Sequence, residues 1–206
     1  RMQASVPELT DINEEPAHTF ELYGEDAKKP GTFANTVLMA RRLSERGVRF
    51  VQIMMKSQPW DTHTSNVENT KKCCLETDGP VGALLTDLQQ RGLLDSTLVL
   101  WGGEFGRTPG AELRGNSAKG TEGRDHHPYG FSVWMAGGGI KGGQTYGATD
   151  DFGYRSVDKR TKYSDYHATV LNQLGLNHEE LVHEHNGRNE RLTDVYDAHV
   201  IKELIT

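Results

Sequence analysis

Apolar residues recur along this chain in two patterns, a helical period of three to four positions and short continuous runs. The helical period predicts three helices, over residues 32–46, 66–92 and 164–174. The continuous runs predict three buried strands, over residues 48–55, 97–101 and 131–136. Helices that alternate with such strands indicate an α/β fold with a mostly parallel sheet and flanking helices.

Glycine, serine and proline residues mark where the predicted helices begin and end. Gly47, Gly92 and Gly175 each follow a helical segment, where a glycine commonly caps the last turn. Ser164 is expected to cap the start of the third helix. Pro80 suits a first helical turn, so it marks a candidate interruption of the second helix.

The remaining segments are polar or irregular. Residues 1–31 are rich in proline and acidic side chains, and we expect a surface lead-in there, followed by one domain over residues 32–206. Residues 110–124 form a long loop rich in glycine and charge, a kind of loop that is often functional. Residues 177–191 are predicted to be a polar surface segment, and residues 192–205 carry some helical periodicity.

Composition narrows the classes of protein to consider. The chain has 206 residues, of which 35% are hydrophobic and 25% charged, as in a soluble globular domain. Its net charge of −6 argues against nucleic acid as a partner, because phosphate binding needs a basic surface. No apolar run is long enough to cross a membrane.

The start of the chain and its cysteines give two further expectations. The chain opens with Arg1 and has no apolar stretch of a signal peptide, so we expect a fragment or a processed chain. Cys73 and Cys74 are adjacent and lie in a predicted helix, so we expect packing thiols. Zinc binding by cysteine alone is not expected, because there is no C-x-x-C pair.

The first candidate for chemistry is the pair Asp61 and His63, which follows the predicted strand over residues 48–55. Two residues one position apart on extended backbone point the same way, so both can reach one ion. Divalent metals accept this mixture of carboxylate and imidazole. The alternative is a surface turn with a solvated histidine.

The second candidate is Glu104, which follows two glycines at the end of the predicted strand over residues 97–101. Glycine lets the backbone or a ligand approach closely. Arg107 lies three residues later and can either neutralise Glu104 or bind an oxyanion. The alternative is a buried ion pair without a catalytic role.

The third candidate is the run Asp125, His126 and His127. Successive side chains on extended backbone alternate between faces, so the two histidines cannot easily bind one ion together. We expect one to be a metal ligand and the other to support it or to contact substrate.

Other polar residues receive a structural interpretation. His167 is favoured as a packing or capping residue at the start of a helix. His178, His183 and His185 lack the spacing of a zinc protease. The glycine-rich run over residues 137–143 lacks the lysine and hydroxyl of a phosphate-binding loop and is interpreted as a turn.

The chain resembles the carboxyl-terminal half of the DUF1501 family, which is in turn similar to the alkaline phosphatase and sulfatase superfamily. The stretches that carry this resemblance are Trp60-Asp-Thr-His63, Asp95-Ser-Thr-Leu-Val-Leu-Trp-Gly-Gly-Glu-Phe-Gly-Arg-Thr-Pro109, Gly123-Arg-Asp-His-His-Pro128, Trp134-Met-Ala-Gly-Gly-Gly139 and Asp165-Tyr-His-Ala-Thr-Val-Leu-Asn-Gln-Leu-Gly175. The resemblance implies the carboxyl-terminal portion of an alkaline-phosphatase-like fold, with a mostly parallel sheet.

The superfamily resemblance also implies roles for individual residues. The implied metal ligands are Asp61, His63, Glu104 and His127. The hypothesis built on this resemblance adds Asp125 as a ligand or as support for one, and adds Arg107, which would meet the anionic group, and His126 as catalytic residues. Zinc or calcium would be the metal. Phe105 departs from the superfamily pattern, because it stands where a ligand histidine is expected.

The function implied by this resemblance is metal-dependent hydrolysis of sulfate or phosphate esters, with an anionic ester such as a sulfated glycan as substrate. The sulfatase signature C-x-P-x-R is absent from this sequence. The first metal ligand and the nucleophile of the superfamily lie nearer its amino end, so we expect little or no activity from this chain alone. The full-length protein is expected in the periplasm or outside the cell.

A non-catalytic exported protein, which binds a glycan or a partner protein on a degenerate phosphatase-like scaffold, is the alternative. The replacement of a ligand histidine by Phe105 favours it.

Overall fold

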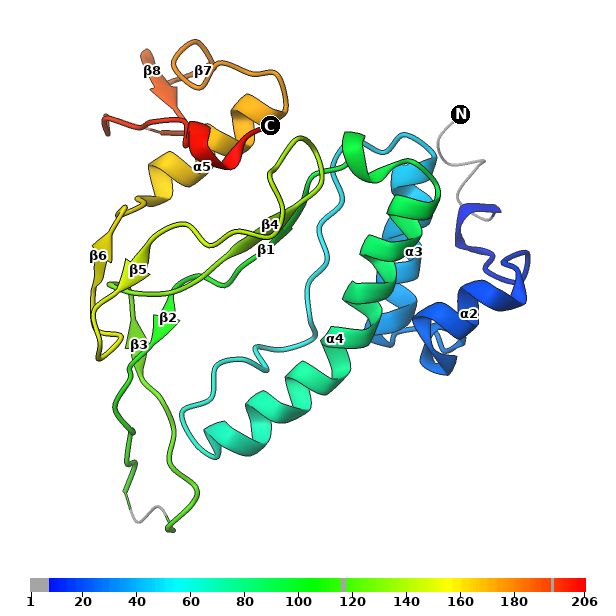
Figure 1. Cartoon of the computed structure of the whole chain (residues 1–206), viewed down its shortest axis with the longest axis horizontal. Helices are drawn as coiled ribbons and strands as arrows, with labels where there is room; N and C mark the ends of the chain where they lie inside the picture. The colour runs from blue at the N-terminus through cyan, green and yellow to red at the C-terminus, as the bar shows by residue number, and fades with distance from the viewer. Residues whose placement is uncertain (1–7, 116–117, 194) are drawn as a thin grey trace. The chain divides into compact units, whose positions relative to one another are not determined.

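The structure is a computed structural model that describes residues 8–115, 118–193 and 195–206 (Figure 1). The chain divides into two compact units. The helical unit consists of the chain up to Thr97 together with Gly110–Asp125, and the strand unit consists of Leu98–Pro109 and His126–Thr206. Each unit is described by itself.

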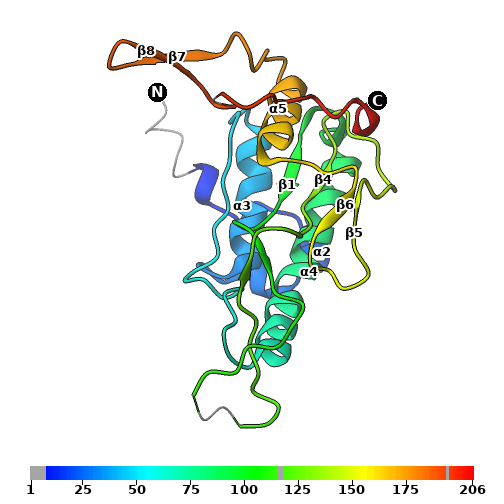
Figure 2. The same cartoon turned by 90° about the vertical axis from the view of Figure 1, so that its left-hand side faces the viewer.

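The helical unit is built on two long helices. Its described elements are α2 (Ala17–Tyr23), η1 (Glu25–Lys28), α3 (Phe33–Glu45), α4 (Asn66–Gln90) and η2 (Leu94–Ser96). Helix α3 packs along α4, and α2 contacts both α4 and η1 (Figures 1 and 2). The apolar core lies where these helices meet, and it is formed by Tyr23, Ala27, Val37, Leu38, Ala83, Leu84 and Leu88.

The predicted first helix is confirmed as α3. The Oγ1 of Thr32 accepts a hydrogen bond from the Asn35 backbone N–H at 3.1 Å, which fixes the start of the helix. Gly47 follows the helix with a φ of 80°, as a left-handed capping residue does.

The predicted interruption of the second helix is wrong. Helix α4 runs for 25 residues, and Pro80 lies inside it. Cys73, Thr77, Ala83 and Leu88 are all buried along α4, so the helix buries side chains both before and after the proline. We infer that this burial offsets the backbone hydrogen bond that Pro80 cannot make.

The strand unit contains only short antiparallel pairs among its described residues. The pairs are β1 (Val99–Trp101) with β4 (Trp134–Ala136), β2 (Gly106–Arg107) with β3 (His126–His127), β5 (Ala148–Thr149) with β6 (Ser156–Asp158), and β7 (Val182–His185) with β8 (Arg188–Arg191). Each pair is a separate two-stranded sheet. The unit also holds α5 (Tyr163–Gln173) and η3 (Lys202–Leu204).

The expected alkaline-phosphatase-like fold with a mostly parallel sheet is therefore wrong. The predicted strand over residues 48–55 forms no strand, and two of its large side chains, Phe50 and Met54, are 77% and 76% exposed. The other two predicted strands are shortened to β1 and β4, which pair antiparallel. An apolar run indicates burial, but the partner and direction of a strand depend on residues far away in the sequence.

One prediction for the carboxyl-terminal part is wrong, and one element there was not predicted. Helix α5 begins at Tyr163 rather than after a Ser164 cap, and the Asp165 carboxylate instead accepts a hydrogen bond from the Lys162 backbone N–H at 2.8 Å. The polar segment over residues 177–191 contains the β7–β8 hairpin (Figure 2). Its turn is formed by Asn186 and Gly187, both with positive φ, which is a favoured two-residue hairpin turn.

Two further expectations concern the end of the chain and membranes. Residues 192–205, where helical periodicity was noted, contain only the short 3-10 turn η3 in their described part. In the described part of the chain, no helix has the length and apolar character needed to cross a membrane.

Candidate metal centre

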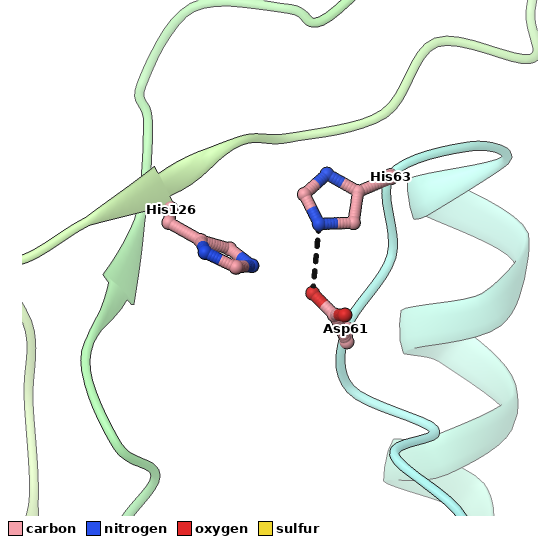
Figure 3. Close-up of side chains that lie close together, drawn as sticks. All are labelled: Asp61, His63 and His126. Carbon is pink, nitrogen blue, oxygen red and sulfur yellow. Dashed lines mark ion pairs between the residues drawn. The ribbon is translucent and has the colours of Figure 1, made fainter.

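The loop before α4 brings Asp61 and His63 together in the helical unit. His63 Nε2 lies 3.0 Å from Asp61 Oδ1 (Figure 3). Thr62, between them, is buried, and its hydroxyl donates a hydrogen bond to Asn66 Oδ1 at 2.5 Å. Because Asn66 begins α4, this bond ties the loop to the first turn of the helix.

The segment Gly110–Asp125 lies against this loop. Glu112 and Gly123 exchange two backbone hydrogen bonds of 2.8 and 2.9 Å, which bring the two ends of the segment together. The Arg124 backbone N–H then donates to the Thr62 carbonyl oxygen at 3.0 Å. These bonds place the side chains of Glu112 and Asp125 beside His63.

The result is a cluster of one imidazole and two carboxylates within the helical unit. Glu112 Oε2 lies 2.7 Å from His63 Nδ1. One ligand atom from each of His63, Glu112 and Asp125 lies within 4.8 Å of the others. His63 and Glu112 are mostly buried, with side chains 17% and 18% exposed, whereas Asp125 is exposed and gives the cluster an open side.

Both ring nitrogens of His63 face a carboxylate, so a hydrogen or a metal ion must lie between each nitrogen and its neighbour. A hydrogen bond from Arg114, at 2.5 Å, and the contact with His63 hold the pKa of Glu112 below its usual value. Glu112 is therefore ionised at neutral pH, which is the form that binds a metal.

The donor set fits a divalent metal. A metal on Nδ1 of His63 would leave Nε2–H to donate to Asp61, and such a carboxylate behind a metal-binding histidine fixes the ring orientation. Of the two predicted ions, zinc fits an imidazole ligand better, because calcium prefers oxygen ligands only.

The other predicted site residues belong to the strand unit. Glu104 Oε1 accepts a hydrogen bond from Arg107 Nη2 at 2.9 Å, and the Glu104 side chain is 59% exposed, so this pair is not the buried one considered as an alternative. The Arg107 guanidinium lies over the Phe105 ring, 5.6 Å from its centre.

His126 and His127 both lie on β3 of the strand unit. His126 is exposed, and its ring centre is 4.6 Å from that of Phe105. His127 is 7% exposed, and its Nε2 donates a hydrogen bond to the Tyr154 carbonyl oxygen at 2.6 Å. The difference in burial agrees with the expectation that the two side chains lie on opposite faces.

The predicted ligands thus divide between the units. Asp61 and Asp125 each lie beside His63 in the helical unit, and Glu104 and His127 lie in the strand unit. Sequence reasoning missed Glu112. The sequence offered one signal, the long loop over residues 110–124, which is of a kind that is often functional. It offered no motif that distinguishes Glu112 from the other acidic residue of this loop.

His167 and Cys73 agree with their structural interpretation. The His167 ring packs against Tyr163 and Tyr166, with ring centres 5.4 and 5.6 Å away. Cys73 is buried, which raises the pKa of its thiol. Cys74 is exposed, so the expectation of a packing thiol is wrong for this residue.

The DUF1501 family, described as "Protein of unknown function (DUF1501)", matches residues 1–205 of this chain. The chain belongs to this family. The comparison with curated proteins gave no match for this DUF1501 chain, and the comparison with solved structures gave none either. The wider relation to the alkaline phosphatase and sulfatase superfamily remains a prediction.

Proposed function

We propose that this DUF1501 chain binds a divalent metal, with zinc favoured, and forms the metal-binding portion of a hydrolase of sulfate or phosphate esters. The observation that carries the proposal is the convergence of His63, Glu112 and Asp125, whose ligand atoms lie within 4.8 Å of one another. Isolated acidic groups are common on protein surfaces, but here a half-buried imidazole stands between two carboxylates.

The residues around the proposed metal have separate tasks. Asp61 orients the His63 ring through Nε2, and Arg114 holds the Glu112 oxygen that does not face His63. Asp125 is exposed, so the open side of the cluster can admit water or a substrate oxygen. A bound metal would polarise an ester and stabilise the negative charge that develops on its oxygens.

The proposal of ester hydrolysis rests on the sequence resemblance to the superfamily rather than on the geometry of the cluster. The superfamily resemblance supports roles for Glu104 and His127 as ligands, and within this hypothesis Arg107 and His126 act in catalysis. It also supports export of the full-length protein. The sequence lacks the sulfatase signature that would supply a nucleophile, so we expect metal binding by this chain with little or no ester turnover.

Calorimetric titration of the chain with zinc, together with metal analysis after dialysis, tests this proposal. We expect one zinc ion per chain, with affinity lowered at least tenfold by His63→Ala, Glu112→Ala or Asp125→Ala. His183→Ala is the matched control, because this histidine lies on the exposed β7–β8 hairpin. A folded chain that takes up no zinc, or a His63→Ala variant with unchanged affinity, contradicts the proposal.

A non-catalytic binding protein is the second candidate. The observation that favours it is the packing of Phe105 against His126 and below Arg107, since an apolar ring occupies a position where the superfamily pattern has a ligand. The zinc titration separates the two candidates, because this alternative predicts a fully folded chain without stoichiometric metal.

A further inference from the structure

A cavity of about 400 Å³ opens beside the metal cluster, within the helical unit. Asp61 and His63 line one part of it, and Lys72 and Glu76 from α4 line another. The remaining lining residues are polar or small: Gln58, Pro59, Thr62, Thr64, Asn69 and Cys73. The volume is that of a small-molecule site, and the polar lining suits a small polar molecule rather than an apolar one.

The charges around the cavity are not equivalent. Asp61 already faces His63 Nε2 at 3.0 Å, so this ring takes up one of its acceptor oxygens. Lys72 is exposed, and no ion pair joins it to a carboxylate among the residues that the structure describes. Its ammonium group therefore has three hydrogen-bond donors available for a ligand. Glu76 lies one helical turn after Lys72 on α4, and its negative charge weakens the binding of an anion in the cavity.

We propose that this cavity binds the oxyanion group of a small ligand, such as inorganic phosphate, sulfate or an ester of either, with Lys72 as its counter-charge. This inference rests on the proposed function, because it makes the cavity the ester-binding part of the same site. Of the proposed ligands His63, Glu112 and Asp125, His63 lines the cavity, so a metal bound to it would add a second positive charge close to the cavity.

Cys73 is not the residue that acts on such a ligand. Its thiol is buried and donates a hydrogen bond to the Pro59 carbonyl oxygen at 3.4 Å. Burial also raises the pKa of this thiol, which keeps it protonated at neutral pH. Cys73 therefore only forms part of the cavity wall, and Lys72 provides the charged contact with the ligand.

The test is calorimetric titration of the zinc-loaded chain with sodium sulfate, and of the metal-free chain with sodium phosphate. We expect Lys72→Gln to weaken sulfate binding by about tenfold, because it removes one charge-assisted hydrogen bond. Glu76→Gln should strengthen binding about twofold, because it removes a like charge. Lys71→Gln is the matched control, since Lys71 is exposed on the same helix but does not line the cavity.

Each outcome has a definite meaning. Unchanged anion affinity in Lys72→Gln, or equal losses in Lys71→Gln and Lys72→Gln, overturns the inference. Weaker anion binding in Glu76→Gln overturns it too, because removal of a negative charge from the cavity should strengthen the binding of an anion. Zinc uptake without sulfate binding defeats this inference and leaves the metal proposal standing. Phosphate binding that depends on Lys72, in a chain that does not bind zinc, supports this inference and contradicts the metal proposal.

Discussion

Gly123 lies directly against the backbone of His63. A Cβ atom placed on Gly123 would come within 1.9 Å of the His63 carbonyl oxygen, which no side chain can avoid by rotating. This contact is the tightest constraint on the segment that carries Glu112 and Asp125, and it explains why that position of the loop is a glycine.

Gly123→Ala should therefore disrupt the metal cluster. The added methyl group forces the loop away from His63, so we expect zinc affinity to fall at least tenfold by calorimetry. Gly82→Ala is a suitable control, because nothing lies within 4 Å of a Cβ atom at this position of α4. It should leave zinc binding unchanged and stabilise the chain by about 0.5 to 1 kcal/mol, since alanine favours helices. Equal zinc affinity in both variants would show that the contact does not hold the site.

Asp61→Asn should weaken metal binding without unfolding the chain. The amide retains an oxygen that can accept from His63 Nε2 but loses the negative charge, so zinc affinity should drop by about tenfold. Asp61→Ala, which also loses the acceptor, should drop it further. The imidazole resonances of His63 in NMR report whether the ring tautomer has changed. Asp78→Asn, on the exposed side of α4, serves as the comparison. Identical zinc affinities for Asp61→Asn and Asp78→Asn would exclude an orienting role for Asp61.

Acid should destabilise the helical unit through Glu15. This side chain is 5% exposed and pairs with the guanidinium groups of Arg41, at 2.5 Å, and Arg42. Burial opposes its ionisation, but the hydrogen bonds from both arginines outweigh that effect and hold the pKa of Glu15 below its usual value. The stabilisation is therefore present above the pKa of the unfolded chain, 4.5, and is lost as the pH falls through the lower folded value.

Urea unfolding between pH 7 and pH 3 measures this effect. Glu15→Gln should lower the free energy of unfolding by about 3 kcal/mol at pH 7, because the buried guanidinium of Arg42 loses the Glu15 carboxylate. The Arg41 guanidinium also loses it but keeps Asp87 and Glu45. Its stability should then depend less on pH than that of the wild type. Glu14→Gln, at an exposed neighbouring position, should behave as the wild type. A steeper pH dependence in Glu15→Gln would be incompatible with this assignment.

Zinc should raise the thermal stability of the chain. Binding to the folded state alone stabilises it by about 2.7 kcal/mol at a free zinc concentration one hundred times the dissociation constant. Differential scanning calorimetry should therefore show a higher Tm with zinc, reversed by a chelator. His63→Ala should lose this shift, whereas His183→Ala should keep it. A zinc-dependent shift of equal size in His63→Ala would place the bound zinc elsewhere.

Local signals allowed the helices to be predicted, because their start and end depend on neighbouring residues. Thr32 and Gly47 bound α3 as expected, and Gly175 follows α5 with a φ of 74°. The Asn186-Gly187 turn carried an equally local signal for a hairpin, which was missed because the flanking residues are polar. The sheet was predicted wrongly because pairing of β1 with β4 is a long-range property.

The candidate site was only partly predictable for a similar reason. Asp61 and His63 are close in sequence, so their proximity followed from backbone geometry. Glu112 contacts His63 although it lies 49 positions later in the chain, and the course of its loop depends on Gly123 and Thr62. Neither residue type nor spacing in the sequence encodes that course directly.

The helical unit is assembled from two separate stretches of chain, with Leu98–Pro109 of the strand unit between them. During synthesis, α3, α4 and the Asp61–His63 pair emerge before Glu112 and Asp125. The metal cluster is therefore completed only when the later stretch returns to the earlier one. A chain that ends at Thr97 would keep His63 but lose Glu112 and Asp125, two of the three proposed metal ligands. Metal binding would therefore show that the later stretch has joined the helical unit.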